Sequence, residues 1–323
     1  MSIDISVITC AHNPRPEYLA LVLDALKDQT LDKQRWEYLL IDNSSSEPLA
    51  SRADLSWQPN ARHIREDNLG LTHARLRGIR ESRGEVLVFV DDDNVLDADY
   101  LEQVMDVSAR HSMIGAWGGQ RRPVFEQQPP AWTKRHWAHL ALHEFENDSW
   151  SNQSQLPDTM PNGAGLCVRK LVAHFYADLH ANGQRAFVMD RNGSSLISGG
   201  DVDLASCACD IGLGVGLFAS LKLSHLIPSE RLTEDYLLRL TEGIGYSGVI
   251  LESFRPSASS LAPRRWSRKA ADILRYLRMD AREKRVHRAH KKGQSRARKD
   301  LAAARATQST EAGMPTNLEL ERR

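Results

Sequence analysis

The most constraining feature of the sequence is a short apolar run that ends in three consecutive acids. Val86-Leu87-Val88-Phe89-Val90 has the composition of a buried β-strand, and Asp91-Asp92-Asp93-Asn94 follows it directly. Adjacent carboxylates repel one another, so a fold tolerates them best where a divalent cation or its bound phosphates offset the charge. Open α/β sheets bind ligands at this end of a strand. The alternative is a solvated loop that caps the helix beginning near Ala98, although one or two acids would suffice for a cap.

Strands and helices alternate through the first 111 residues. The expected strands are residues 5–11, 36–41, 63–65 and 86–90. The expected helices are the segment from Leu19 to Leu26, then residues 69–82 and 97–111. This alternation predicts an α/β fold with a mostly parallel, Rossmann-like sheet flanked by helices.

The pattern becomes irregular beyond Ile114. The aromatic, Gly-rich and Pro-rich segment 117–132 predicts an ordered loop, whose tryptophans could stack on sugars or simply pack together. Further elements are expected as a strand at 165–168, helices from Lys170 and after Asp201, and a helical stretch at 229–243. Residues 256–263, rich in Pro, Ser and Ala, form the best boundary.

Charge divides the chain into two parts although the formal net charge is zero. Residues 264–299 hold 15 Lys and Arg against three acids, and the remainder holds 27 basic and 39 acidic residues. We expect a basic amphipathic helix at 264–290 as a C-terminal extension, and a disordered tail at 291–323. Trp266, Ile273, Leu274 and Leu277 share one helical stripe, which is typical of a helix at an anionic membrane surface; a solvated helix packed on the acidic body is the alternative.

No apolar run is long enough to span a bilayer and no signal sequence is evident, so we expect a cytoplasmic chain. The four cysteines have no metal-ligand or disulfide spacing and indicate a reducing compartment.

Several motifs occur in an order that resembles family 2 inverting glycosyltransferases of the GT-A fold. They are Val7 to Asn13, Leu40 to Ser45, Asn68-Leu69-Gly70-Leu71 with Arg75, Phe89 to Asp93, Pro161 to Gly165, Ser198 to Leu204, and His225 to Pro228 with Arg231. The resemblance implies a transferase that moves a sugar from a nucleotide-diphosphate sugar, as in polysaccharide biosynthesis. It makes residues 1–110 the nucleotide-sugar-binding half and residues 111–255 the acceptor-binding and catalytic half.

The resemblance also implies a divalent cation, Mn²⁺ or Mg²⁺. Asp91 and Asp93 match the acids of the DxD motif, and His225 stands where the third metal ligand is often found. A cation held by oxygen ligands would neutralise the leaving diphosphate. Asp91 could instead contact the ribose, and Asp92 is an additional acid that could bind the cofactor or face solvent.

Asp201 matches the family's catalytic base, which would remove a proton from the acceptor hydroxyl during attack. Gly200 stands where the family commonly has Glu, so the chain departs from the motif there. The alternative role for Asp201 is a helix N-cap, and both roles could hold.

The resemblance places the donor nucleotide at the first strand ends, where turn chemistry is the alternative explanation for the same residue types. The predicted cofactor-binding residues are Thr9, Asn13, Arg15, Asp42, Asn68, Arg75, Asp91 and Asp92. Thr9 and Asn13 would line the base pocket, Asp42 would accept a hydrogen bond from the base, and Arg15 or Arg75 would meet phosphate.

The sequence therefore predicts a metal-dependent glycosyltransferase that acts on a glycan or lipid-linked acceptor. Nucleic acid is not an expected partner, and the expected location is the cytoplasm or the inner face of a membrane. Two alternatives are a noncatalytic sugar-nucleotide or glycan-binding protein, and a nucleotide sensor whose basic arm binds nucleic acid.

Overall fold

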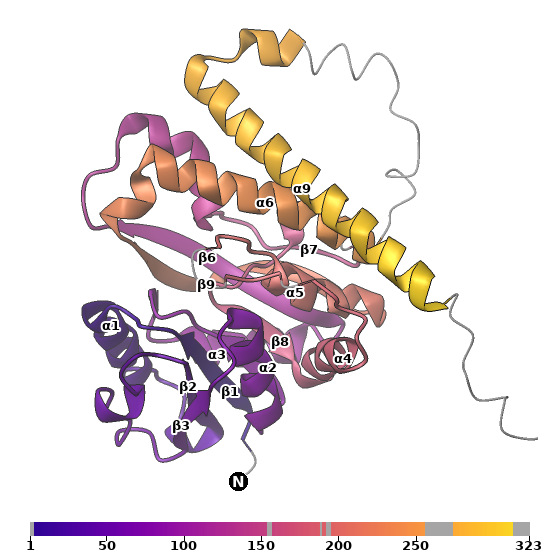
Figure 1. Cartoon of the computed structure of the whole chain (residues 1–323). Coiled ribbons are helices and arrows are strands. Elements are labelled where there is room, and N and C mark those ends of the chain that lie inside the picture. Colours follow the sequence, from indigo (N-terminus) through magenta and orange to yellow (C-terminus); the bar gives the residue numbers. More distant parts are fainter. Residues whose placement is uncertain (1–2, 154–156, 188, 192–194, 256–273, 313–323) are drawn as a thin grey trace, which may run out of the picture. The chain divides into compact units, whose positions relative to one another are not determined.

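The structure is a computed structural model that describes residues 3–153, 157–187, 189–191, 195–255 and 274–312 (Figure 1). The chain divides into two compact units, Met1–Leu237 and Leu238–Arg323.

Nine strands form one sheet among the described residues of the first unit. They are β1 (Ile5–Ala11), β2 (Trp36–Asn43), β3 (Ala61–Glu66), β4 (Val86–Phe89), β5 (Asn94–Leu96), β6 (Ile114–Phe125), β7 (Ser149–Ser151), β8 (Leu166–Arg169) and β9 (Gly214–Ile227). Their order is β3-β2-β1-β4-β8-β6-β9-β5, and β7 pairs with β9.

The strands β3, β2, β1 and β4 run parallel, as predicted, so their carboxyl ends meet at one edge of the sheet. The second half is mixed, because β8 runs antiparallel to both β4 and β6, while β6 and β9 are parallel. The edge that collects the ends of β1, β2 and β4 is where ligands bind in sheets of this kind.

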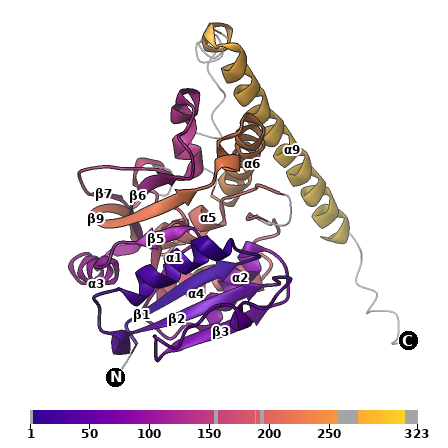
Figure 2. The ribbon, with the colours of Figure 1, turned by 90° about the vertical axis from the view of Figure 1, so that its left-hand side faces the viewer.

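Helices cover both faces of the sheet (Figures 1 and 2). Buried residues of α1 (Pro16–Lys27) and α3 (Tyr100–Arg110) share one apolar core with Val7 of β1. Buried residues of α2 (Leu71–Glu81), α4 (Lys170–Ala181) and α5 (Gly200–Asp210) share a second core with Ile8 on the opposite face. Alternate residues of β1 thus point to opposite cores, which explains its apolar run.

The expected loop at 117–132 is wrong for its first part, because β6 continues to Phe125. The glycines that predicted a loop serve a close approach of two strands: a Cβ on Gly119 would overlap the carbonyl oxygen of Leu221 in β9. Trp117 is completely buried and cannot stack on a sugar. The 3₁₀ segment Ala131–Leu140 follows, with Trp137 against Phe125.

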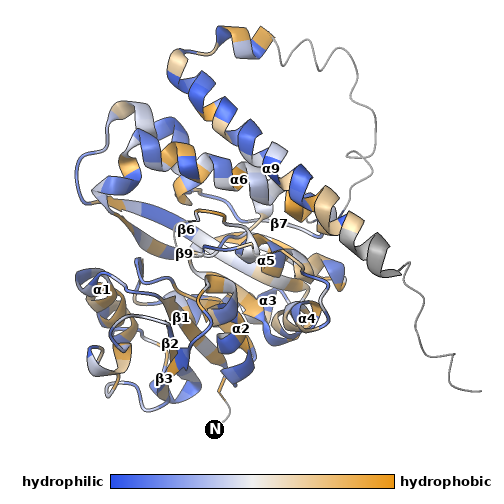
Figure 3. Cartoon of the chain, in the orientation of Figure 1, coloured by the Kyte–Doolittle hydropathy of each residue, from blue (hydrophilic) through white to orange (hydrophobic). Residues whose placement is uncertain are grey.

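The second unit contains most of α6 (Glu234–Phe254) and the long helix α9 (Ala281–Ala312). The prediction of a disordered segment from Lys291 is wrong for residues 291–312, which continue α9. This part pairs with α6: Gly293 of α9 lies against the backbone of Glu242, and Ala297 is completely buried. Hydrophilic residues recur along α9 (Figure 3). Trp266, Ile273 and the last 11 residues of the chain lie outside the described residues.

Candidate active site

The ends of β1 and β2 are tied together by short polar loops. Asn13, in the left-handed conformation with φ of 47°, follows β1. Its side-chain oxygen accepts a hydrogen bond from the Ser46 amide at 2.9 Å, and its own amide donates to the Ser45 hydroxyl at 3.0 Å. The exposed Asn13 side chain therefore lies at the predicted edge of the sheet and is held by the loop that follows β2.

Asp42 is buried at the end of β2, and both of its carboxylate oxygens already have partners. The amides of Ser45 and Leu49 donate to it at 2.9 and 3.1 Å, and Arg65 forms an ion pair at 2.8 Å. Burial alone would raise the pKa of Asp42, but these hydrogen bonds hold it below its ordinary value. The carboxylate thus remains charged and orders its own loop.

The acidic triplet forms the turn between β4 and β5. Asp93 is buried, and Asp91 and Asp92 are half-buried. Burial and then the charge of Asp93 raise the pKa of Asp91. Burial, followed by repulsion from Asp93 and Asp91, raises the pKa of Asp92 to about 7. Asp92 therefore does not simply face solvent. Three carboxylates lie close together in a partly buried turn.

Asp93 stays charged because Arg231 and His225 lie beside its two oxygens. Arg231 forms an ion pair with its Oδ2 at 2.9 Å, and Nε2 of His225 lies 3.5 Å from its Oδ1. Burial would raise the pKa of Asp93, but the attraction of His225 and Arg231 outweighs it and holds the pKa far below its usual value. The pairing of β5 with β9 places His225 here, because it sets Asn94 opposite His225.

The donor chemistry at Asp93 fits a divalent cation with two ligands. Bonds of about 2.1 Å to Mg²⁺ allow two ligand atoms to lie 3.5 Å apart. Carboxylate oxygen suits Mg²⁺ and Mn²⁺, and a neutral imidazole nitrogen is a common metal ligand. Within the described ranges, no three His, Cys, Asp or Glu side chains gather as a cation site. The structure thus brings Asp93 and His225 together and does not join Asp91, the third predicted ligand, to them.

Asp201 lies in the first turn of α5 with its carboxylate directed at a backbone amide. Its Oδ2 accepts a hydrogen bond from Gly163 at 2.5 Å. The N-cap position of α5 is Gly199, and Asp201 lies inside the helix, so the alternative role as the N-cap is wrong. The hydrogen bond instead fixes one carboxylate oxygen against the segment before β8.

Arg75 is buried and points from α2 toward a carboxylate of the chain. Its Nη1 forms an ion pair with Asp190 at 2.8 Å. Burial would lower the pKa of Arg75, but Asp190, Asp201 and Asp91 raise it above its ordinary value, so it is permanently charged. The predicted phosphate ligand therefore lies among three acids that include the predicted base.

The other predicted residues have different surroundings. Arg15 lies at the start of α1 and forms ion pairs with Glu126 at 3.3 Å and Glu230 at 2.5 Å. Thr9 is completely buried within β1, below the edge of the sheet. Asn68 is exposed between β3 and α2, and its carbonyl accepts a hydrogen bond from the Asn43 side chain at 2.8 Å.

Sequence reasoning gave no role to three residues that organise this site. Arg231 was part of a motif, and its pairing with Asp93 depends on the path of the chain after β9. Asn43 joins β2 to the loop before α2, because its Oδ1 also accepts the Gly70 amide at 2.8 Å. Asp190 belongs to no motif, and it forms the ion pair with Arg75.

The comparisons with known proteins agree with this arrangement. The model of the family described as Glycosyl transferase family 2 matches residues 6–171, slightly more than half of the chain. The chain belongs to this family. The family 2 match covers β1 through the start of α4, and therefore includes the acidic triplet and the first strand ends.

Curated relatives of this family 2 chain align over about a third of its length. A putative glycosyltransferase, EpsH of Bacillus subtilis, is 28% identical over 103 residues, which are 31% of this chain and 29% of the relative. An uncharacterized glycosyltransferase of Haemophilus influenzae is 31% identical over 110 residues, 34% of this chain and 36% of the relative. The aligned segments thus span about a third of each relative.

Solved structures show the same fold over most of the family 2 chain. The crystal structure of S. aureus TarS has a TM-score of 0.52 and 14% identity, with 92% of this chain and 54% of that one covered. A crystal structure of TarS residues 1–349 has a TM-score of 0.50 and 14% identity, with 94% and 92% covered. These similarities confirm the GT-A-like α/β fold.

No described helix is long and apolar enough to cross a membrane.

Proposed function

We propose that this family 2 chain transfers a sugar, with inversion, from a nucleoside-diphosphate sugar to a hydroxyl of a glycan or lipid-linked acceptor. The observation that carries the proposal is the convergence of Asp201 and the acidic triplet through Arg75. The charges of Asp91 at the end of β4 and of Asp201 at the start of α5 both raise the pKa of this buried guanidinium, and its Nη2 and Oδ2 of Asp201 both border Gly163. The proposed catalytic base, Asp201, and the turn proposed to bind the diphosphate therefore lie near the same point at the carboxyl edge of the sheet.

Asp201 acts as the general base in this proposal. The amide of Gly163 donates to its Oδ2, and the amide of Val202, the next residue in the helix, donates to its Oδ1. An acceptor hydroxyl that approaches this carboxylate can pass its proton to it as the new glycosidic bond forms. The nucleoside diphosphate departs from the opposite side of the sugar, which inverts the anomeric carbon.

Asp93 and His225 would hold Mn²⁺ or Mg²⁺, with Asp91 nearby, and the ion would neutralise the leaving diphosphate. The edge of the sheet where the nucleobase and ribose would lie is lined by Asn13, Asp42 and Asn68. Arg15, Arg75 and Asp92 are the remaining donor-site candidates. Arg15 would have to leave Glu126 or Glu230 before it could contact phosphate.

The proposal is tested by a thermal-shift panel of UDP-glucose, UDP-N-acetylglucosamine, GDP-mannose and dTDP-glucose, each with and without Mn²⁺. A donor at 100 times its dissociation constant stabilises the folded chain by about 2.7 kcal/mol, which is readily measured. We expect at least one donor to stabilise the chain in a Mn²⁺-dependent way. If a donor binds but no nucleoside diphosphate is ever released, the noncatalytic alternative replaces this proposal.

We also propose that the basic C-terminal part contacts an anionic membrane surface where a lipid-linked acceptor would lie. Leu274 and Leu277 have exposed fractions of 50% and 65%, although both are large and apolar. Exposed basic residues follow along α9, among them Arg288, Lys291, Arg298 and Lys299. Apolar and basic side chains exposed on neighbouring helical segments are typical of interfacial helices.

A further inference from the structure

A buried carboxylate that belongs to no motif lies beside Arg75, in a segment that is hydrogen-bonded to the start of α5. Asp190, in the segment between α4 and α5, is 3% exposed. Its neighbour Met189 accepts a hydrogen bond from the amide of Gly200 at 3.1 Å, which joins this segment to the first residue of α5. Asp201 is the next residue of the helix, so the position of Asp190 is coupled to that of Asp201.

Both oxygens of Asp190 are used by α2. Oδ1 forms the ion pair with Nη1 of Arg75 at 2.8 Å, and Oδ2 accepts a hydrogen bond from the Thr72 hydroxyl at 2.9 Å. Two charge-assisted contacts of this kind hold a carboxylate in one orientation. Asp190 is therefore a fixed counter-ion for Arg75.

The carboxylate of Asp190 also explains why residue 200 is glycine. A Cβ on Gly200 would overlap Oδ2 of Asp190 and would lie 2.6 Å from its Cγ. No side chain fits at residue 200 while Asp190 keeps its place.

Arg75 has a second acid within reach, which is Asp201. A Cβ on Gly163 would lie 3.1 Å from Nη2 of Arg75 and 3.1 Å from Oδ2 of Asp201, so the two groups border the same small space beside Gly163. If Asp190 were removed, the buried guanidinium of Arg75 would lack its counter-ion, and pairing with Asp201 would offset the cost of that buried charge. An aspartate in such a pair is a poor proton acceptor.

We infer that Asp190 is a positioning residue for sugar transfer, which takes the ion pair of Arg75 and so leaves Asp201 available to accept the acceptor's proton. The inference rests on the proposed function of Asp201. It predicts a loss in the chemical step, because the contacts of Asp190 with Arg75 and Thr72 control how Arg75 lies beside Asp201.

The test compares Asp190→Asn, Asp190→Ala and the exchange variant Asp190→Ala with Gly200→Asp. The readouts are nucleoside diphosphate release from the best donor of the panel above, donor affinity by calorimetry, and the melting temperature. We expect Asp190→Asn to lower kcat about 10- to 100-fold, the scale for a misplaced catalytic group, and to lower kcat by a larger factor than it lowers donor affinity. The exchange variant should recover at least tenfold over Asp190→Ala, because removal of the Asp190 carboxyl frees the space for a side chain on residue 200.

Gly200→Asp alone is the matched control, and it should be inactive because Asp190 still fills that space. A kcat of Asp190→Asn within threefold of the parent overturns the inference, and so does an exchange variant that folds but is no more active than Asp190→Ala. If Asp190→Asn does not fold, the exchange variant decides. Asp201→Asn separates the two proposals: full activity there overturns the proposed function, whereas a loss there with an active Asp190→Asn overturns only the role of Asp190.

Discussion

The guanidinium of Arg231 lies 2.9 Å from Oδ2 of Asp93, so the acid predicted to bind a cation already carries a positive partner. The other oxygen of Asp93 faces His225. A buried carboxylate without such partners would be costly to keep charged. The pair shows how the chain holds this acid ready in its ionised form.

We expect Asp93→Ala to abolish Mn²⁺-dependent nucleotide binding, because the diphosphate would lose its bridging cation. His225→Ala should weaken binding less, since the carboxylate remains. Calorimetry with UDP, GDP and dTDP in the presence and absence of Mn²⁺ measures both effects. Asp99→Ala, which removes an exposed aspartate just before α3, is the control and should bind normally. Unchanged Mn²⁺-dependent binding in Asp93→Ala would show that the metal assignment is wrong.

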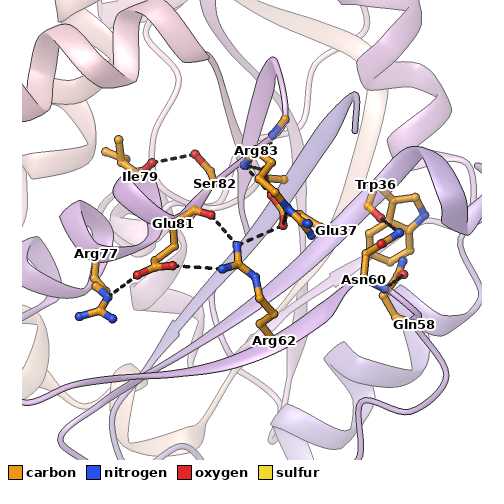
Figure 4. Close-up of polar contacts among 12 residues, drawn as sticks. Trp36, Glu37, Gln58, Asn60, Arg62, Arg77, Ile79, Glu81, Ser82 and Arg83 are labelled. Atoms are coloured by element: carbon orange, nitrogen blue, oxygen red, sulfur yellow. Dashed lines mark hydrogen bonds and ion pairs between the residues drawn. The ribbon is translucent and has the colours of Figure 1, made fainter. Parts of the chain in front are cut away.

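The fully buried Glu37 anchors a charged cluster at the other end of β2 (Figure 4). It pairs with Arg83 at 2.8 Å and Arg62 at 3.2 Å, and the Ser6 hydroxyl donates to it at 2.7 Å. Glu37→Gln should lower the free energy of unfolding by about 1–3 kcal/mol, since the bonds to charged groups are lost.

Urea unfolding measures this change, and Glu81→Gln is the matched control. Glu81 also pairs with Arg62, but its side chain is 31% exposed, so its loss should cost less than about 1 kcal/mol. Nucleotide affinity should be unchanged in both variants, because the cluster is remote from the carboxyl ends of the strands. Equal destabilisation in the two variants would contradict the importance given to burial.

The pairing of α6 with α9 depends on glycines that let the two backbones touch. A Cβ on Gly245 would overlap the carbonyl oxygen of His290, whereas a Cβ on Gly248 of the same helix would meet nothing within 4 Å. Gly245→Ala should therefore loosen the pair, and trypsin should cut the Lys- and Arg-rich α9 about tenfold faster. Gly248→Ala should leave cleavage unchanged or slow it, because alanine favours helix. Equal cleavage of the two variants would mean that close contact does not hold α9.

Membrane contact is tested by sedimentation with vesicles that contain phosphatidylglycerol. We expect the full chain to sediment at low salt, since each basic residue near an anionic surface contributes up to about 1 kcal/mol. Leu274→Asn with Leu277→Asn, or glutamine at Arg288, Lys291, Arg298 and Lys299 together, should abolish this without changing nucleotide affinity. A full chain that never sediments, or that sediments equally with neutral vesicles, would exclude the membrane role.

Local patterns predicted the first half of the fold because β1, β2 and β4 are largely apolar strands whose apolar residues alternate between two cores. β6 was missed because Gly119 was interpreted as a loop residue, although it serves a contact with β9 that only the folded chain reveals. The same holds in the site. Strand-end residues such as Asp42 and Asp93 could be predicted from what precedes them. Asp190 could not, because its partner Arg75 is distant in sequence and its segment has no periodicity.

Turnover by Asp201→Asn is the most direct test of the central claim. Asparagine keeps the shape of the side chain and a possible bond to Gly163, but it cannot accept a proton. With the best donor and Mn²⁺, we predict donor affinity near that of the parent and nucleoside diphosphate release reduced by about 100-fold or more. Release within a few fold of the parent would contradict the assignment of Asp201 as the base.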